Sequence, residues 1–158
     1  MKTVGDGAFR REDLNSRSND MTYSGALSFL RRKYSRDLTG VDVVVTGIPY
    51  DCATSNRPGA RFGPRGIRSA STELASLDAF PFKFDPFKYL AVVDYGDVWL
   101  DYGYPQNVVE KVEKHADTIF LLGDVCWIYM QILTHLLILN LFRYTHPLHQ
   151  NTHSTHLF

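Results

Sequence analysis

The sequence predicts an α/β fold with a mainly parallel sheet, because two kinds of segment alternate along the chain. Two short runs, 41–48 and 90–93, are almost continuously apolar, which is typical of strands buried on both faces of a sheet. Two longer segments, 65–77 and 108–119, repeat apolar residues at helical spacing. Because parallel strands are joined by crossovers, the order strand, helix, strand, helix predicts a largely parallel sheet with helices packed on it.

The two predicted strands differ in how they end. The first is rich in valine and isoleucine, whose branched side chains favour strands, and it stops at Gly47 and Pro49. The second stops at a polar sequence that contains Asp94 and Asp97. Two acidic residues at a strand end could form a catalytic pair, but we interpret them as structural residues that hydrogen-bond the following loop.

Each predicted helix has one apolar face. The first helix follows Pro64, a residue that suits the first turn of a helix. Its expected buried face consists of Ile67, Ala70, Leu74 and Leu77. The expected buried face of the second helix consists of Val108, Val109, Val112, Ala116 and Ile119. His115 lies among polar neighbours in that helix, so we expect it to face solvent.

The composition argues against several classes of protein. The chain has 158 residues with 17 basic and 17 acidic side chains, and this neutral balance argues against a nucleic-acid partner. Cys52 and Cys126 stand far apart, so they predict neither a disulfide framework nor a zinc site. Residues 1–19 are polar and lack the apolar stretch of a secretory signal, so we expect a cytoplasmic protein.

Composition also divides the chain into three parts. Residues 1–21 are rich in small polar and charged residues and predict a flexible arm. Residues 22–124 carry the alternating strands and helices and form the predicted domain. Residues 125–158 hold a single Asp, Glu, Lys or Arg side chain, Arg143, together with five of the six histidines. We therefore expect 125–158, an apolar run followed by a Thr- and His-rich tail, not to belong to the same fold.

The loop between the first strand and the first helix is the strongest candidate for a functional site. In open α/β sheets, ligands bind at the carboxyl ends of the strands, and this loop follows such an end. It contains three polar or basic side chains that we take as substrate-loop candidates, Asn56, Arg57 and Arg61. The alternative is a structural loop that caps the sheet or contacts another subunit.

The segment 47–68 reads Gly-Ile-Pro-Tyr-Asp-Cys-Ala-Thr-Ser-Asn-Arg-Pro-Gly-Ala-Arg-Phe-Gly-Pro-Arg-Gly-Ile-Arg. It resembles the signature that follows the first strand in the agmatinase branch of the ureohydrolase (arginase/agmatinase) family. Flanking segments such as 29–38 and 92–97 match in the same order, and the resemblance covers residues 22–119.

The resemblance implies both a fold and a chemistry. The fold is the N-terminal portion of an arginase-like αβα sandwich around a mainly parallel sheet. Enzymes of this family hydrolyse a small guanidino substrate to urea and an amine, so that agmatine gives putrescine. Two manganese ions activate the water that attacks the guanidinium carbon. Members of the family are usually homo-oligomers.

The sequence departs from the family at the metal ligands. The family places them in a Gly-Gly-Asp-His segment, then an Asp-Ala-His-x-Asp segment, then an Asp-x-Asp segment. The nearest match here is Leu122-Gly123-Asp124-Val125, in which valine, a side chain that cannot coordinate a metal, stands where the histidine belongs. We therefore assign no catalytic residue and no metal ligand, Asp124 being at best part of a degenerate motif. The chain alone is expected to bind no manganese and to be inactive.

Besides a metal-binding tail formed by the histidines at 146, 149, 153 and 156, two other functions stay open. One is a non-catalytic protein that joins subunits of related enzymes. The other is a tail-anchored membrane protein, because the apolar run 125–142 is just long enough to cross a bilayer. Gln131, His135 and Asn140 interrupt that run and make a membrane partner the weaker interpretation.

Overall fold

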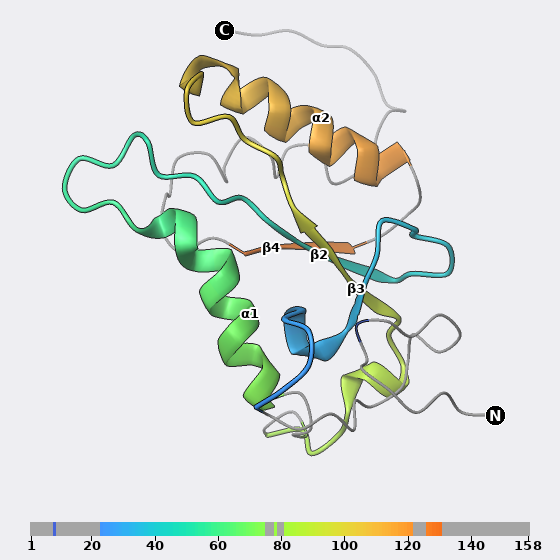
Figure 1. The fold of residues 1–158 in the computed structure, drawn as a ribbon. Helices are drawn as coiled ribbons and strands as arrows, with labels where there is room; N and C mark the ends of the chain where they lie inside the picture. Colours follow the sequence, from blue (N-terminus) through green and yellow to red (C-terminus); the bar gives the residue numbers. More distant parts are fainter. Residues whose placement is uncertain (1–7, 9–22, 75–77, 79–80, 122–125, 131–158) are drawn as a thin grey trace, which may run out of the picture.

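A computed structural model describes residues 8, 23–74, 78, 81–121 and 126–130 (Figure 1). It contains a parallel sheet of four strands in the order β1-β3-β2-β4. The strands are β1 (Lys33–Tyr34), β2 (Val43–Gly47), β3 (Val92–Asp97) and β4 (Cys126–Met130). The two α-helices are α1 (Gly63–Leu74) and α2 (Val108–Leu121). Short 3-10 helices lie at η2 (Phe29–Arg31), η3 (Ala60–Phe62), η4 (Pro86–Lys88) and η5 (Pro105–Asn107).

The two helices lie on opposite faces of the sheet (Figure 1). From β2, the chain crosses through α1 to β3 on one side of β2, and from β3 it returns through α2 to β4 on the other side. Right-handed crossovers that run in opposite directions place their helices on opposite faces. The predicted α/β class and the partial αβα sandwich are therefore confirmed.

Side chains of β2 and β3 alternate between the two faces, as strand geometry requires. On the α2 face, Val44 and Val93 pack with Tyr95 and with Ile119 of α2. On the α1 face, Val45 and Val92 pack together with partly buried residues, Ile67 of α1 among them. Both faces of these strands are thus covered, which explains their continuous apolar runs.

The strand β3 is longer than the sequence predicts, because it continues through the polar residues at its end. Val43 pairs with Val92 and Val45 with Asp94, but Thr46 pairs with Gly96, so one extra residue is accommodated in β3. Gly96 takes a positive φ of 80° at this irregularity. Asp94 is fully buried, and it can stay inside the sheet because its charge is paired across the α1 face, as described below.

The sheet also extends past the domain end that the composition predicts after residue 124. The strand β4 pairs in parallel with β2 along its whole length, from Val43 opposite Cys126 to Gly47 opposite Met130. A segment without charges suits a strand of a parallel sheet as well as it suits a tail, and composition alone does not separate the two. We propose that the domain reaches at least residue 130.

Several expectations fall outside the described residues. They include Asp124, the tail from 131 onwards, and the arm at 1–21 except for Ala8, which is buried. The segment 23–38 contributes the 3-10 helix η2 and the two-residue strand β1. Among the described residues, no helix has both the length and the apolar character needed to span a membrane.

Candidate functional site

The loop that follows β2 lies where the topology of the sheet predicts a ligand site. The crossovers that leave β2 and β3 run in opposite directions, so β2 and β4 flank the point at which the strand order reverses. Ligands of open α/β sheets bind outside the carboxyl ends of the strands at such a point. The segment 48–62 leaves the carboxyl end of β2 and projects away from the sheet before it enters α1 (Figure 1).

A buried carboxylate closes the base of this loop. The Asp51 side chain has no solvent exposure, and its Oδ2 atom accepts hydrogen bonds from the backbone N–H groups of Gly59 at 2.6 Å and Arg61 at 3.2 Å. Its Oδ1 atom accepts a third, from Nε of Arg61 at 2.5 Å. These bonds join the two ends of the segment 51–61.

The guanidinium group of Arg61 is also held from a second side. Its central carbon lies 4.7 Å from the centroid of the Tyr102 ring, within the range of a cation–π interaction. The hydroxyl of Tyr102 donates a hydrogen bond to the carbonyl oxygen of Pro49 at the start of the loop. Asp51, Arg61 and Tyr102 therefore form a clamp, and we use this name for the three residues below.

The electrostatics of the clamp favour the ionised forms of both partners. Burial raises the pKa of Asp51, but hydrogen bonds from the Gly59 and Arg61 backbone and from the Arg61 side chain outweigh it and lower the pKa overall. The hydrogen bond to Asp51 raises the pKa of Arg61. A charge-assisted hydrogen bond of this kind stabilises the loop base at neutral pH.

The tip of the loop contrasts with its clamped base. Residues 52–58 are all exposed, and Asn56 and Arg57 make no hydrogen bond or ion pair within the described part of the chain. The three substrate-loop candidates thus divide into two groups. Arg61 is engaged in the clamp, whereas Asn56 and Arg57 are exposed to solvent at the tip of the loop.

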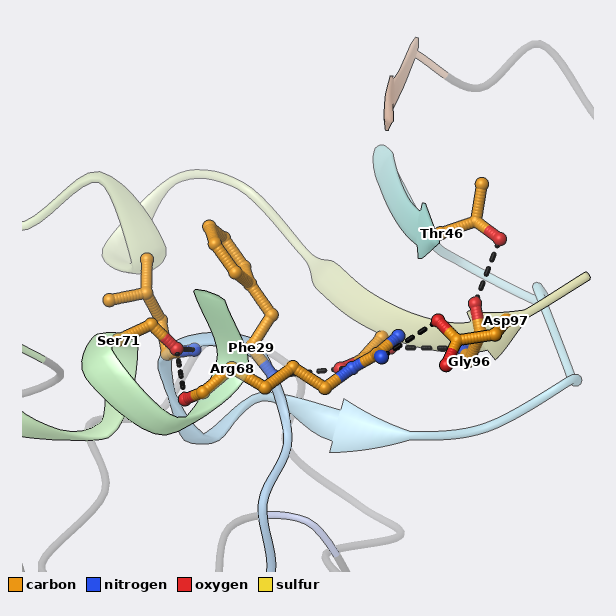
Figure 2. A network of polar contacts seen from close by, with 8 residues as sticks. Phe29, Thr46, Arg68, Ser71, Gly96 and Asp97 are labelled. Carbon is orange, nitrogen blue, oxygen red and sulfur yellow. Dashed lines mark hydrogen bonds and ion pairs between the residues drawn. The ribbon is translucent and has the colours of Figure 1, made fainter. Parts of the chain in front are cut away.

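A second polar cluster attaches α1 to the sheet (Figure 2). Arg68 of α1 is buried, and its Nε and Nη2 atoms donate to the two carboxylate oxygens of Asp94 at 2.7 and 2.9 Å. Its Nη1 atom donates to Asp97 Oδ1 at 2.7 Å. Arg68 thus makes a bidentate pair with Asp94 and a single hydrogen bond to Asp97, which requires the planar guanidinium group that lysine lacks. We call Arg68, Asp94 and Asp97 the arginine–aspartate cluster.

The arginine–aspartate cluster also organises the segment before β1. Asp94 Oδ2 accepts the backbone N–H of Phe29 at 2.7 Å, and Ser71 Oγ accepts that of Leu30 at 2.9 Å (Figure 2). Burial lowers the pKa of Arg68, but the two aspartates outweigh it and raise the pKa overall. The structural interpretation of Asp94 and Asp97 agrees with these contacts, because both carboxylates bind Arg68.

Gly47 sits where the loop and the cluster meet. A Cβ atom added there would overlap Asp97 Oδ1 and would lie 2.7 Å from Cβ of Pro64 in α1. The end of β2 therefore needs a residue without a side chain so that α1 and Asp97 can approach.

The expectation that His115 faces solvent is wrong. The ring is half-buried against the sheet, with Nε2 2.8 Å from Thr46 Oγ1 and an edge-to-face contact with Tyr95 at 5.4 Å. The Thr46 hydroxyl donates to the carbonyl of Gly96, so Nε2 must be the donor to Thr46. Burial, and then the positive charge of Arg36, lower the pKa of His115 to about 4.

Comparison with known proteins decides the family. A model of the arginase family matches residues 41–130, more than half of the chain. This chain belongs to the arginase family. The match includes β4, which supports a domain that continues to residue 130.

Individual relatives of this arginase-family chain are agmatinases. It is 54% identical over 119 residues to an agmatinase of Chromobacterium violaceum, a match that covers 75% of this chain and 37% of the relative. It is 45% identical over 86 residues to an agmatinase of Neisseria gonorrhoeae, covering 54% of this chain and 28% of the relative. The chain therefore spans well under half the length of these relatives.

Solved structures give the same result. A hypothetical agmatinase from Burkholderia thailandensis superimposes with a TM-score of 0.77 at 48% identity, covering 82% of this chain and 40% of the other. A proclavaminate amidino hydrolase from Streptomyces clavuligerus superimposes with a TM-score of 0.61 at 29% identity, covering 70% and 36%. These similarities confirm the arginase-like fold.

The described residues of this arginase-family chain do not supply a donor set that fits the manganese pair the family implies. Among the described residues, no three His, Cys, Asp or Glu side chains converge on a position that could hold a metal ion. Three carboxylates near the carboxyl ends of β2 and β3 are paired with arginine: Asp51 binds Arg61, while Asp94 and Asp97 bind Arg68. We therefore derive no catalytic step through a metal.

Proposed function

We propose that this chain is the N-terminal part of an agmatinase-type hydrolase and contributes its substrate loop. The parent activity is hydrolysis of a linear guanidino compound, with agmatine giving putrescine and urea. The observation that carries this proposal is the 54% identity to an agmatinase over a stretch that contains the clamped loop. The expected compartment is the cytoplasm.

The proposed role of the chain is to present polar groups to substrate at the end of β2. Asn56 and Arg57 project from a loop whose base is fixed by the clamp, so their backbone positions are set without using their side chains. Fixing a loop in advance reduces the entropy lost when a ligand binds. Arg61 supports this role indirectly, through Asp51.

We propose that the metal ligands of the parent enzyme belong to segments that are not found intact in this sequence. A formiminoglutamase from Trypanosoma cruzi, whose structure is described with Mn²⁺, shares the fold with a TM-score of 0.50 and 25% identity. In this chain, the printed sequence contains none of the three ligand segments intact. We therefore propose that the isolated chain does not hydrolyse agmatine and that it requires the rest of the fold, and its homo-oligomeric assembly, for activity.

A urea-release assay tests the isolated chain. The chain is incubated with agmatine and MnCl₂, and an intact agmatinase from Chromobacterium violaceum serves as the positive control. We expect urea from the control and none above buffer from the chain. Manganese-dependent urea release by the chain, removed by EDTA, would overturn the proposal of inactivity.

A chimera tests the proposed substrate loop. Residues 23–121 of this chain replace the matching part of the Chromobacterium violaceum agmatinase, which retains the relative's own remaining sequence. We expect an active chimera in which Arg57→Ala lowers kcat/KM by roughly tenfold or more, the effect of losing one hydrogen-bonding or charged contact. Arg65→Ala, a change of an exposed arginine on α1, is the matched control and should leave kcat/KM unchanged. An Arg57→Ala chimera as active as its parent would remove this residue from the substrate site.

A further inference from the structure

In the clamp, two groups contact the guanidinium of Arg61: the Asp51 carboxylate and the Tyr102 ring. Both would contact a guanidinium group in the same way if it belonged to another molecule. One is the Asp51 carboxylate, which is shielded from solvent and lies 2.5 Å from Arg61 Nε. The other is the face of the Tyr102 ring, 4.7 Å from the guanidinium carbon. A carboxylate beside a guanidinium and an aromatic ring across its plane are two common means of guanidinium recognition.

The clamp is also accessible. The Arg61 side chain is 35% exposed and Tyr102 is 40% exposed, so one side of the bound guanidinium faces solvent. A small molecule can therefore approach the position of the guanidinium without unfolding the sheet. Two of the hydrogen bonds that position the Asp51 carboxylate come from the backbone N–H groups of Gly59 and Arg61, so they do not require the Arg61 side chain.

We propose that Asp51 and Tyr102 form a guanidinium-binding site that the side chain of Arg61 fills in this structure. When that side chain is removed or displaced, the site takes a small guanidinium compound in its place. This site is separate from the exposed tip that carries Asn56 and Arg57, and it requires no hydrolysis. It therefore stands or falls independently of the proposed function.

A free guanidinium compound has to compete with the Arg61 side chain for this site. Arg61 is joined to the site by its own backbone, so its effective concentration there is in the millimolar range or above. A free guanidinium compound at lower concentration leaves the wild-type site filled by Arg61. Removing the arginine side chain should expose an affinity that the wild-type chain conceals.

Thermal unfolding of Arg61→Ala, with and without ligand, tests the proposal. The probes are agmatine and methylguanidine, with putrescine as a cation of similar length that lacks the planar group. At about 10 mM ligand, we expect agmatine to raise the Tm of Arg61→Ala by roughly 5 °C or more and that of the wild-type chain by about 1 °C or less. Methylguanidine should act in the same direction, and putrescine should not.

Two double variants show whether the ligand occupies the clamp. Asp51→Asn combined with Arg61→Ala removes the charge, and Tyr102→Leu combined with Arg61→Ala removes the ring. We expect the first to abolish the agmatine response and the second to reduce it. An equal response to putrescine, or an undiminished response in the Asp51→Asn double variant, would overturn the proposal.

Refolding provides the readout if Arg61→Ala does not fold on its own. The variant is then diluted from denaturant into agmatine or putrescine, and the soluble yield is measured. Recovery in agmatine but not in putrescine supports the site. Equal yields in both amines, or no recovery in either, contradict it.

Discussion

The helices α1 and α2 cover opposite faces of one sheet, but they are held there by different forces. The buried residues of α2 are Val108, Val112, Ala116 and Ile119, which fit the apolar stripe of an ordinary amphipathic helix. The buried residues of α1 are Gly63, Pro64, Arg68, Ser71 and Thr72. The first helix is therefore attached largely through hydrogen bonds and ion pairs, and the second through apolar packing.

The difference shows what helical periodicity can and cannot reveal. Apolar spacing predicted an inward face for α1 that included Ala70 and Leu74, and this prediction is wrong, because both residues are exposed. Ile67 alone of the described members of that face is partly buried against the core. Arg68 of α1 is buried against the sheet in place of the apolar residues Ala70 and Leu74. Its partners Asp94 and Asp97 lie 26 and 29 positions away in the sequence, so local spacing does not reveal them.

Of the changes that test this difference between the helices, Arg68→Ala should lower the free energy of unfolding the most. It leaves the fully buried Asp94 and the neighbouring Asp97 without their cation, and breaking a buried ion pair costs about 3–5 kcal/mol. That loss is comparable to the whole stability of a small domain, so the variant should unfold at much lower denaturant concentration. Urea unfolding followed by circular dichroism measures the effect.

The conservative change Arg68→Lys is the control for charge. It keeps a cation but loses the fork that binds Asp94 through two nitrogen atoms, so its stability should lie between those of Arg68→Ala and the wild type. A loss below about 1 kcal/mol in Arg68→Ala would show that the cluster does not hold α1 in place.

Ile119→Ala makes the matching change on α2. Ile119 is 1% exposed and packs in a cluster with Val44, Val93 and Tyr95, so its truncation should cost about 2–4 kcal/mol in free energy of unfolding. Val109→Ala, at a position 52% exposed on the same helix, should change stability by less than about 0.5 kcal/mol. Equal effects of the two changes would contradict the apolar attachment of α2.

His115 is the polar exception on α2, and it makes a pH-dependent contribution. Its pKa is lowered from 6.5 to about 4 in the folded chain, so the unfolded chain binds the proton more readily. This contribution is fully present above pH 6.5 and is lost as the pH falls through 4. The full shift would correspond to about 3 kcal/mol, and partial exposure reduces our expectation to about 1–2 kcal/mol.

The variant His115→Gln isolates this contribution. Glutamine can still donate to Thr46 but does not titrate, whereas the neighbouring charges of Arg36 and Asp97 stay in place. Urea unfolding between pH 7 and 4 should show a shallower loss of stability in the variant than in the wild type. Parallel curves would show that His115 is not held in its neutral form.

Leu74→Ala should have the smallest effect. Leu74 is 55% exposed, so its truncation should change the free energy of unfolding by less than about 0.5 kcal/mol. A loss above about 2 kcal/mol would mean that the apolar side of α1 is buried after all, as its spacing predicts. The same unfolding assay as for Arg68→Ala gives the two values under identical conditions.

The sequence predicts those parts of the fold that depend on local pattern. The valine-rich β2, the start of α2 at Val108 and the buried face of α2 follow from spacing, with only Val109 misplaced. The length of β3 does not follow, because Asp94 looks like a strand end until Arg68 is known to lie beside it. The extension by β4 was hidden because absence of charge is shared by buried strands and low-complexity tails.

The sequence predicts a functional loop after β2, and that assignment stays a prediction, whereas the contacts at the base of this loop do not follow from the sequence. Topology and turn residues locate the loop after β2, and the family resemblance supports it. The separate roles of Arg57 and Arg61 depend on Tyr102, which lies 41 positions beyond Arg61 and reaches it only through the fold. The placement of His115 against Thr46 is of the same kind, since the two are 69 positions apart.

Hydrogen exchange of wild type and Arg68→Lys tests most directly whether the two helices are held by different forces. If α1 is attached through the arginine–aspartate cluster, amide protection in Gly63–Leu74 should fall by about tenfold or more in the variant, while protection in Val108–Leu121 changes by no more than about twofold. An equal fall in both helices, or unchanged protection in α1, would contradict the account.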